Sequence, residues 1–159
     1  METTRSFLLG LTEYQHRLLA LAIGCSPLLV TVENKLYSLA RGNNPRQPKR
    51  YSLGQYRQLV YSLIKEGEKE ERNWAVAIQA EIERSGCAMI QTHTGRATVY
   101  PPGREIVPGF KSTSWYLKYE WGPNTKKYYG RDLSQLVKEH AAEFVNIVKP
   151  AGVDTKSRG

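Results

Sequence analysis

The spacing of apolar residues changes at Gly86, and this change constrains the fold more than any other feature of the sequence. Before it, apolar side chains recur at helical spacing, as in Trp74, Ile78 and Ile82. After it, segments such as CAMIQ and RATVY are β-prone. We therefore expect an α+β fold: a helical N-terminal half of about four helices, packed with a C-terminal antiparallel sheet of two hairpins and one terminal helix.

The N-terminal helices are predicted from their capping residues and glycine stops. Thr12 with Gln15, and Ser52 with Gln55, have the spacing of a capping box. The predicted helices cover residues 12–24, 26–42, 52–67 and about 70–86. The last two form a single helix if the chain continues through Gly67.

Two hairpins are predicted after Gly86. In the first, THTG connects CAMIQ to RATVY, with Gly95 in the left-handed conformation. In the second, GPNT connects SWYLKYEW to KKYYG. The intervening PPGREIVPG holds a short strand at best, because each proline removes a donor from the ladder.

The strongest helical pattern follows the second hairpin. Asp132 is an N-cap with Gln135 at the third helical position, and an apolar stripe continues to Val148, with Pro150 ending the helix. The stripe must pack on a surface, and the hairpin is joined to it by a very short connection. One face of the sheet is therefore expected to belong to the core.

Alternation divides the aromatic side chains of the second hairpin between two faces. Its strand SWYLKYEW places Trp115, Tyr119 and Trp121 on the face with Leu117, which we expect to cover the terminal helix. Tyr116 and Lys118 point the other way. Side chains of KKYYG join this second face, where lysines suit phosphates and tyrosines can stack on bases. An ordinary solvated β face has the same composition.

Length and cysteine content bound the organisation of the chain. At 159 residues it has the size of one domain, which we place at 1–150, with a flexible tail at 151–159. Two lobes, 1–86 and 87–150, are the alternative. Cys25 and Cys87 lie far apart in apolar surroundings, so a disulfide framework or zinc site is not indicated, and we expect a cytoplasmic protein.

Net charge points to an acidic partner. The formal charge is +8, which favours nucleic acid, and no apolar stretch approaches the length of a membrane span. The segment RGNNPRQPKR carries four positive charges without an acidic residue, and a polyanion would relieve their repulsion. Hydration of an exposed loop is the competing explanation.

Twelve side chains are predicted to contact nucleic acid, from the basic connector, the hairpins and their surroundings. They are Arg46, Lys49, Arg50, Arg57, Arg96, Arg104, Tyr116, Lys118, Lys126, Lys127, Tyr129 and Arg131. A helix followed by a hairpin is also the element order of a winged helix, with Arg84 near the helix end and Arg96 near the wing tip. An ordinary helix-to-hairpin crossing has the same order.

The order WYLKYEW, turn, KKYYGRDL, helix resembles the small sheet-plus-helix DNA-binding modules of phage integrases and other mobile-element proteins. The resemblance covers about residues 113–148. It implies that Tyr116, Lys118, Lys127 and Tyr129 face DNA while a helix packs behind the sheet. No recombinase catalytic domain accompanies the segment.

These observations favour a non-catalytic nucleic-acid-binding protein, with DNA ahead of RNA as the partner and no cofactor. A small adaptor or inhibitor that engages an acidic protein is the second hypothesis, since Tyr, Trp and Arg also suit protein interfaces. A metal-dependent nuclease is the third, with Glu105, Glu120 and Asp132 as carboxylates that no motif fixes in place. His140 lies on an apolar helix stripe, which favours a hydrogen-bonded core histidine over a metal ligand.

Overall fold

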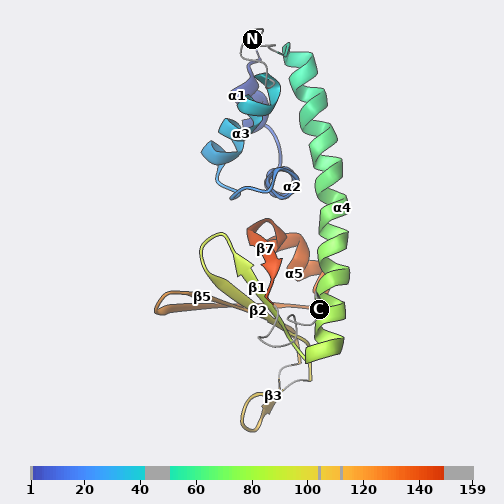
Figure 1. Ribbon diagram of the computed structural model, residues 1–159, viewed down its shortest axis with the longest axis vertical. Coiled ribbons are helices and arrows are strands. Elements are labelled where there is room, and N and C mark those ends of the chain that lie inside the picture. Colours follow the sequence, from blue (N-terminus) through green and yellow to red (C-terminus); the bar gives the residue numbers. More distant parts are fainter. Residues whose placement is uncertain (1, 42–50, 104, 112, 149–159) are drawn as a thin grey trace, which may run out of the picture. The chain divides into compact units, whose positions relative to one another are not determined.

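A computed structural model describes all residues except 1, 42–50, 104, 112 and 149–159. The described chain is an α+β fold, with helices in the N-terminal half and strands with a short helix in the C-terminal half, which confirms the predicted class (Figure 1). The helices are α1 (Thr4–Leu9), α2 (Glu13–Ile23), α3 (Leu29–Arg41), α4 (Leu53–Ser85) and α5 (Leu133–His140). The strands are β1 (Ala88–Thr92), β2 (Arg96–Tyr100), β3 (Glu105–Val107), β4 (Phe110–Lys111), β5 (Trp115–Trp121), β6 (Asn124–Gly130) and β7 (Phe144–Ile147).

The chain divides into two compact units, residues 1–73 and 74–159. This boundary lies inside α4, whereas the two-lobe alternative placed it at Gly86. The physical reason is that the last turns of α4 belong to the core of the second unit. The Trp74 ring packs edge-on against Phe144, with 5.3 Å between ring centroids, and Ile78 is fully buried.

The N-terminal unit begins with a helix that the spacing of apolar residues does not predict. Helix α1 has only six residues, too few for an apolar period to show, but Thr3 and Ser6 form a capping box at its start. Helix α2 begins with the predicted capping box of Thr12 and Gln15. The core of this unit contains Phe7, Leu8, Leu18, Leu19, Val32, Leu36, Tyr56 and Val60.

Gly67 does not interrupt the helix. Helix α4 runs through it for 33 residues, so the two predicted helices are one. A β-carbon at Gly67 would collide with the backbone of Leu18, 2.7 Å from its carbonyl carbon. Glycine is therefore present because α2 approaches α4 too closely for any side chain at this position.

The C-terminal unit contains a five-stranded antiparallel sheet in the order β6-β5-β2-β1-β7. Both predicted hairpins are present as β1–β2 and β5–β6, while β3 and β4 form a separate two-stranded sheet. Gly122 has φ +59° in the second hairpin's turn. The left-handed conformation predicted for Gly95 is wrong. A β-carbon there would lie 2.6 Å from the Glu120 carbonyl oxygen, so close packing against β5 explains this glycine.

The terminal helix is shorter than predicted. Asp132 caps it as expected, accepting from the Gln135 backbone at 2.8 Å, but α5 ends at His140 and a 3-10 turn follows at Ala141–Glu143. The segment Phe144–Ile147 then forms β7, which pairs with the free edge of β1. Its β-branched and aromatic residues suit a strand, and pairing with β1 satisfies backbone groups that a helix could not.

One face of the sheet is core, as the alternation of β5 indicated. Ala88, Ile90, Ala97, Val99, Leu117 and Tyr119 on this covered face are all buried. Tyr119 contacts α5 directly, with 3.2 Å between its hydroxyl oxygen and His140 Nδ1, and burial raises its pKa far above the usual range. His140 is thus a partly buried histidine hydrogen-bonded within the fold, consistent with its place on the apolar stripe.

Two tyrosines of the N-terminal unit have raised pKa values, and from these we predict how the stability of the unit changes at high pH. Burial, then a hydrogen bond and the charge of Glu71, raise the pKa of Tyr14 to about 12. Burial, then the charge of Glu33, raises the pKa of Tyr56 to about 12. Unfolded tyrosine has a pKa of about 10, so between about pH 10 and 12 the unfolded chain releases protons that the folded chain retains. The free energy of unfolding should therefore fall as pH rises through this window.

Urea denaturation followed by helical circular dichroism tests this expectation. Tyr14→Phe should make the decline shallower, because one retained proton is removed. Tyr61→Phe, in the same unit and exposed, is the matched control. Equal declines in the wild type and Tyr14→Phe would contradict the assignment.

Candidate functional site

The second face of the five-stranded sheet carries the polar and charged side chains of the C-terminal unit. We call it the open sheet face and define it by three rows of directly paired residues. The first row is Gln91, Arg96, Glu120 and Thr125; the second is Met89, Thr98, Lys118 and Lys127; the third is Tyr100, Tyr116 and Tyr129. Residues opposite one another in an antiparallel pair share a face, so each row crosses neighbouring strands side by side.

The third row is a line of tyrosine rings. Tyr116 lies between the other two, with ring centroids 5.5 Å from Tyr100 and 5.1 Å from Tyr129. Tyr116 is only 3% exposed, whereas Tyr129 on the edge strand is 58% exposed. Tyr116 is therefore buried within the row, whereas the Tyr129 ring is accessible from solvent.

The first two rows carry the charges. Arg96, Lys118 and Lys127 are positive and Glu120 is negative. Lys118 Nζ lies 3.3 Å from Glu120 Oε2, with the two side chains 33% and 48% exposed. Such an exposed pair is weak and exchanges easily with another anion. Arg96 and Lys127 have no ion-pair partner among the described residues.

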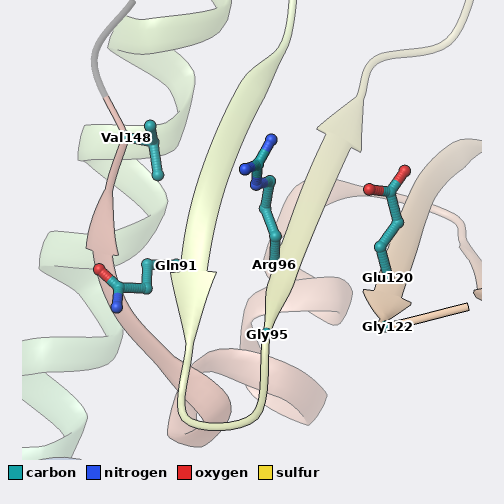
Figure 2. Close-up of a pocket in the computed structure, with 6 residues that line it drawn as sticks. All are labelled: Gln91, Gly95, Arg96, Glu120, Gly122 and Val148. Atoms are coloured by element: carbon teal, nitrogen blue, oxygen red, sulfur yellow. The ribbon is translucent and has the colours of Figure 1, made fainter.

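A hollow of about 520 Å³ opens at the first row. It is lined by Gln91, Gly95, Arg96, Glu120, Gly122 and Val148. Figure 2 shows the side chains of Arg96 and Glu120 extending in the same direction from β2 and β5. The hollow thus combines hydrogen-bond donors with a carboxylate acceptor.

Five of the predicted side chains are brought together on the open sheet face: Arg96, Tyr116, Lys118, Lys127 and Tyr129. The last four are the positions that the resemblance to integrase modules implied, and α5 packs on the other face of the sheet.

Three further predicted residues lie away from this face, and four lie outside the described residues. Lys126 pairs with Tyr119 and so belongs to the covered face, although it is exposed at the sheet edge. Arg131 follows β6 and donates its backbone N–H to Gln135. Arg57 lies in the other unit, where it pairs with Glu2 at 3.0 Å and covers the Phe7 ring. Arg46, Lys49, Arg50 and Arg104 lie outside the described residues.

In the structure, the β1–β2 hairpin that the winged-helix hypothesis treats as the wing lies within the five-stranded sheet. Strands β1 and β2 are interior strands, flanked by β7 and β5, so their hairpin is integrated into the sheet. Arg84 at the end of α4 is paired with the buried Glu81 at 2.6 Å.

Three residues of the open sheet face were not among the predicted binding residues: Gln91, Tyr100 and Glu120. Glu120 had been considered only as a carboxylate of a nuclease. Alternation within RATVY already places Tyr100 on the same face as Arg96. The pairing of β2 with β5, which brings both beside the lysines, has no local signature in the sequence.

Two of the carboxylates considered for a nuclease, Glu120 and Asp132, have other contacts in the structure, and the side chain of Glu105 lies outside the described part. In the part of the chain that the structure describes, no group of three His, Cys, Asp or Glu side chains is placed to hold a metal ion. Glu120 contacts Lys118, and Asp132 caps α5.

Both cysteines are free thiols. No described helix has the length and apolarity of a membrane span.

Comparisons with protein-family models, with curated proteins and with solved structures gave no match for this chain.

Proposed function

We propose that this protein binds nucleic acid without catalysis, with DNA ahead of RNA, and that the open sheet face of the C-terminal unit is the contact surface. The observation that carries the proposal is the convergence of Arg96, Lys118 and Lys127 on three neighbouring strands, beside the tyrosine row. Positive side chains neutralise phosphates and release counterions, which supplies most of the affinity. The exposed ring of Tyr129 adds stacking.

The preference for DNA, and a regulatory or mobile-element accessory role, rest on the resemblance to integrase modules. Its four implied contact residues share the open sheet face, with a helix behind the sheet. This arrangement supports the proposal because Lys118, Lys127 and Tyr129 remain accessible to a ligand, while Tyr116 is buried within the tyrosine row.

Titration of labelled duplex DNA, single-stranded DNA and RNA at low and physiological salt tests the proposal. The association constant should fall steeply with salt, with a logarithmic slope of about −0.7 per phosphate contacted on a single strand and about −0.9 on a duplex. Absence of binding to all three ligands at low salt would overturn the proposal and favour an acidic protein as the partner.

A further inference from the structure

The hollow on the open sheet face has the dimensions of a ligand site. Its volume of about 520 Å³ lies within the roughly 300–1,000 Å³ typical of small-molecule pockets. Gln91, Arg96 and Glu120 belong to three adjacent strands, and the register pairs Arg96 with both of the others. Figure 2 shows the Arg96 and Glu120 side chains extending in the same direction from neighbouring strands, while the Gln91 side chain extends toward β7, near Val148.

The chemistry of the hollow is two-sided. The Arg96 guanidinium presents a fork of donors, and the Glu120 carboxylate presents only acceptors when ionised. A ligand that satisfies both needs a pair of acceptors on one edge and donors on another. Guanine is the base with this combination: O6 and N7 accept on one edge, and N1–H and the N2 amino group donate on the other. Gln91 carries both a donor and an acceptor and so tolerates either edge.

The neighbouring lysine row suits the backbone of the same nucleotide. Lys118 lies two residues before Glu120 on β5, a separation of roughly 6.6 Å along the strand. Lys127 lies beside Lys118 on β6. A base seated in the hollow therefore has two lysines next to it for its phosphates.

We propose that the hollow is a binding site for a guanine base of single-stranded nucleic acid, with Arg96 donating to O6 and N7 and Glu120 accepting from N1–H and N2–H. This inference rests on the proposed nucleic-acid function and names its ligand. In a duplex the N1–H and N2–H groups of guanine are used in pairing with cytosine, so Glu120 reaches them only on an unpaired base. The site therefore selects single strands over duplex.

The test uses the full chain and labelled single-stranded thymine oligonucleotides, either uniform or with one central guanine, adenine or cytosine. Fluorescence anisotropy at physiological salt measures each affinity. The guanine oligonucleotide should bind about 5- to 150-fold more tightly than the uniform one, since a bidentate base contact is worth about 1–3 kcal/mol. Annealing it to its complement should remove this advantage, and a ribonucleotide version tests whether the sugar matters.

Two variants and one charge-matched control separate base recognition from charge. Arg96→Ala should abolish the guanine preference and weaken binding to the uniform strand only modestly, while Arg131→Ala, which removes an equal charge outside the face, should keep the preference. Glu120→Gln removes a negative charge, so it should strengthen binding to the uniform strand and reduce the preference for guanine. A purely structural or electrostatic role of Glu120 would not raise the affinity for the uniform strand and at the same time lower the preference for guanine. Unchanged thermal unfolding of each variant shows that the fold is intact.

Each negative outcome has a distinct meaning. Equal affinity for all four oligonucleotides would overturn the guanine site and leave the proposed nucleic-acid function standing. A guanine preference that survives in Arg96→Ala, or tighter binding of the duplex, would overturn the assignment of the hollow. Failure to bind any oligonucleotide at low salt would remove the proposed function as well.

Discussion

Replacing Lys118 and Lys127 together by alanine is expected to weaken binding to a single-stranded oligonucleotide by about tenfold at low salt. Each exposed charge pair contributes up to about 1 kcal/mol, and two phosphate contacts are lost. The logarithmic salt slope should become shallower by about 1.4, because each contact on a single strand contributes about 0.7. Titrations at several salt concentrations measure both quantities.

Lys126→Ala is the matched control for this variant. Lys126 and Lys127 are adjacent on the same edge strand and both are exposed, but they lie on opposite faces of the sheet. If nucleic acid binds only to the open sheet face, Lys126→Ala should leave the affinity and the salt slope nearly unchanged. Equal losses from Lys126→Ala and Lys127→Ala would show that the edge of the sheet, or net charge alone, attracts the nucleic acid.

Gly67→Ala is expected to lower the free energy of unfolding of the N-terminal unit by about 2 kcal/mol. Helix propensity alone predicts the opposite, a gain of up to about 1 kcal/mol. The gain is outweighed because the added carbon would meet the Leu18 backbone, which cannot rotate aside as a side chain can, and overpacking costs about 1–3 kcal/mol. Denaturation followed by circular dichroism of the helices measures the change.

Gly54→Ala provides the comparison within the same helix. A β-carbon there would meet nothing closer than Ser52 Oγ at 3.9 Å, so its stability should be unchanged or slightly higher. All three tryptophans lie within residues 74–159, so their fluorescence follows the C-terminal unit separately. A Gly67→Ala protein as stable as Gly54→Ala would contradict the close approach of α2 and α4.

The two faces of β5 illustrate what alternation can predict. Successive side chains of a strand point to opposite sides, so Leu117 and Tyr119 could be separated from Tyr116 and Lys118 without knowledge of any partner strand. The same rule applied to β6 separates Lys126 from Lys127, which the predicted binding set had kept together. That error came from treating KKYYG as one basic segment and not as a strand with two faces.

The misassigned end of α5 shows where local patterns fail. Apolar residues at helical spacing continue to Val148, yet Phe144–Ile147 is a strand. The edge of β1 decides this, because its unpaired backbone groups offer hydrogen bonds that become available only once the sheet has formed. The sequence left open whether the helix continues through Gly67 for a related reason, since the contact that requires glycine comes from α2, which is distant in the sequence.

The sequence by itself determined the α+β class, capped starts of several helices, the two hairpins and the two faces of strand β5. These features depend on backbone geometry and on neighbours a few residues away. Only the tertiary structure decided that β2 pairs with β5, which places Arg96 beside Glu120 and brings the charged and tyrosine rows into one surface. Strand order and register depend on contacts between distant segments, whose free energy is fixed by the partner strand and the packed core and not by the local sequence.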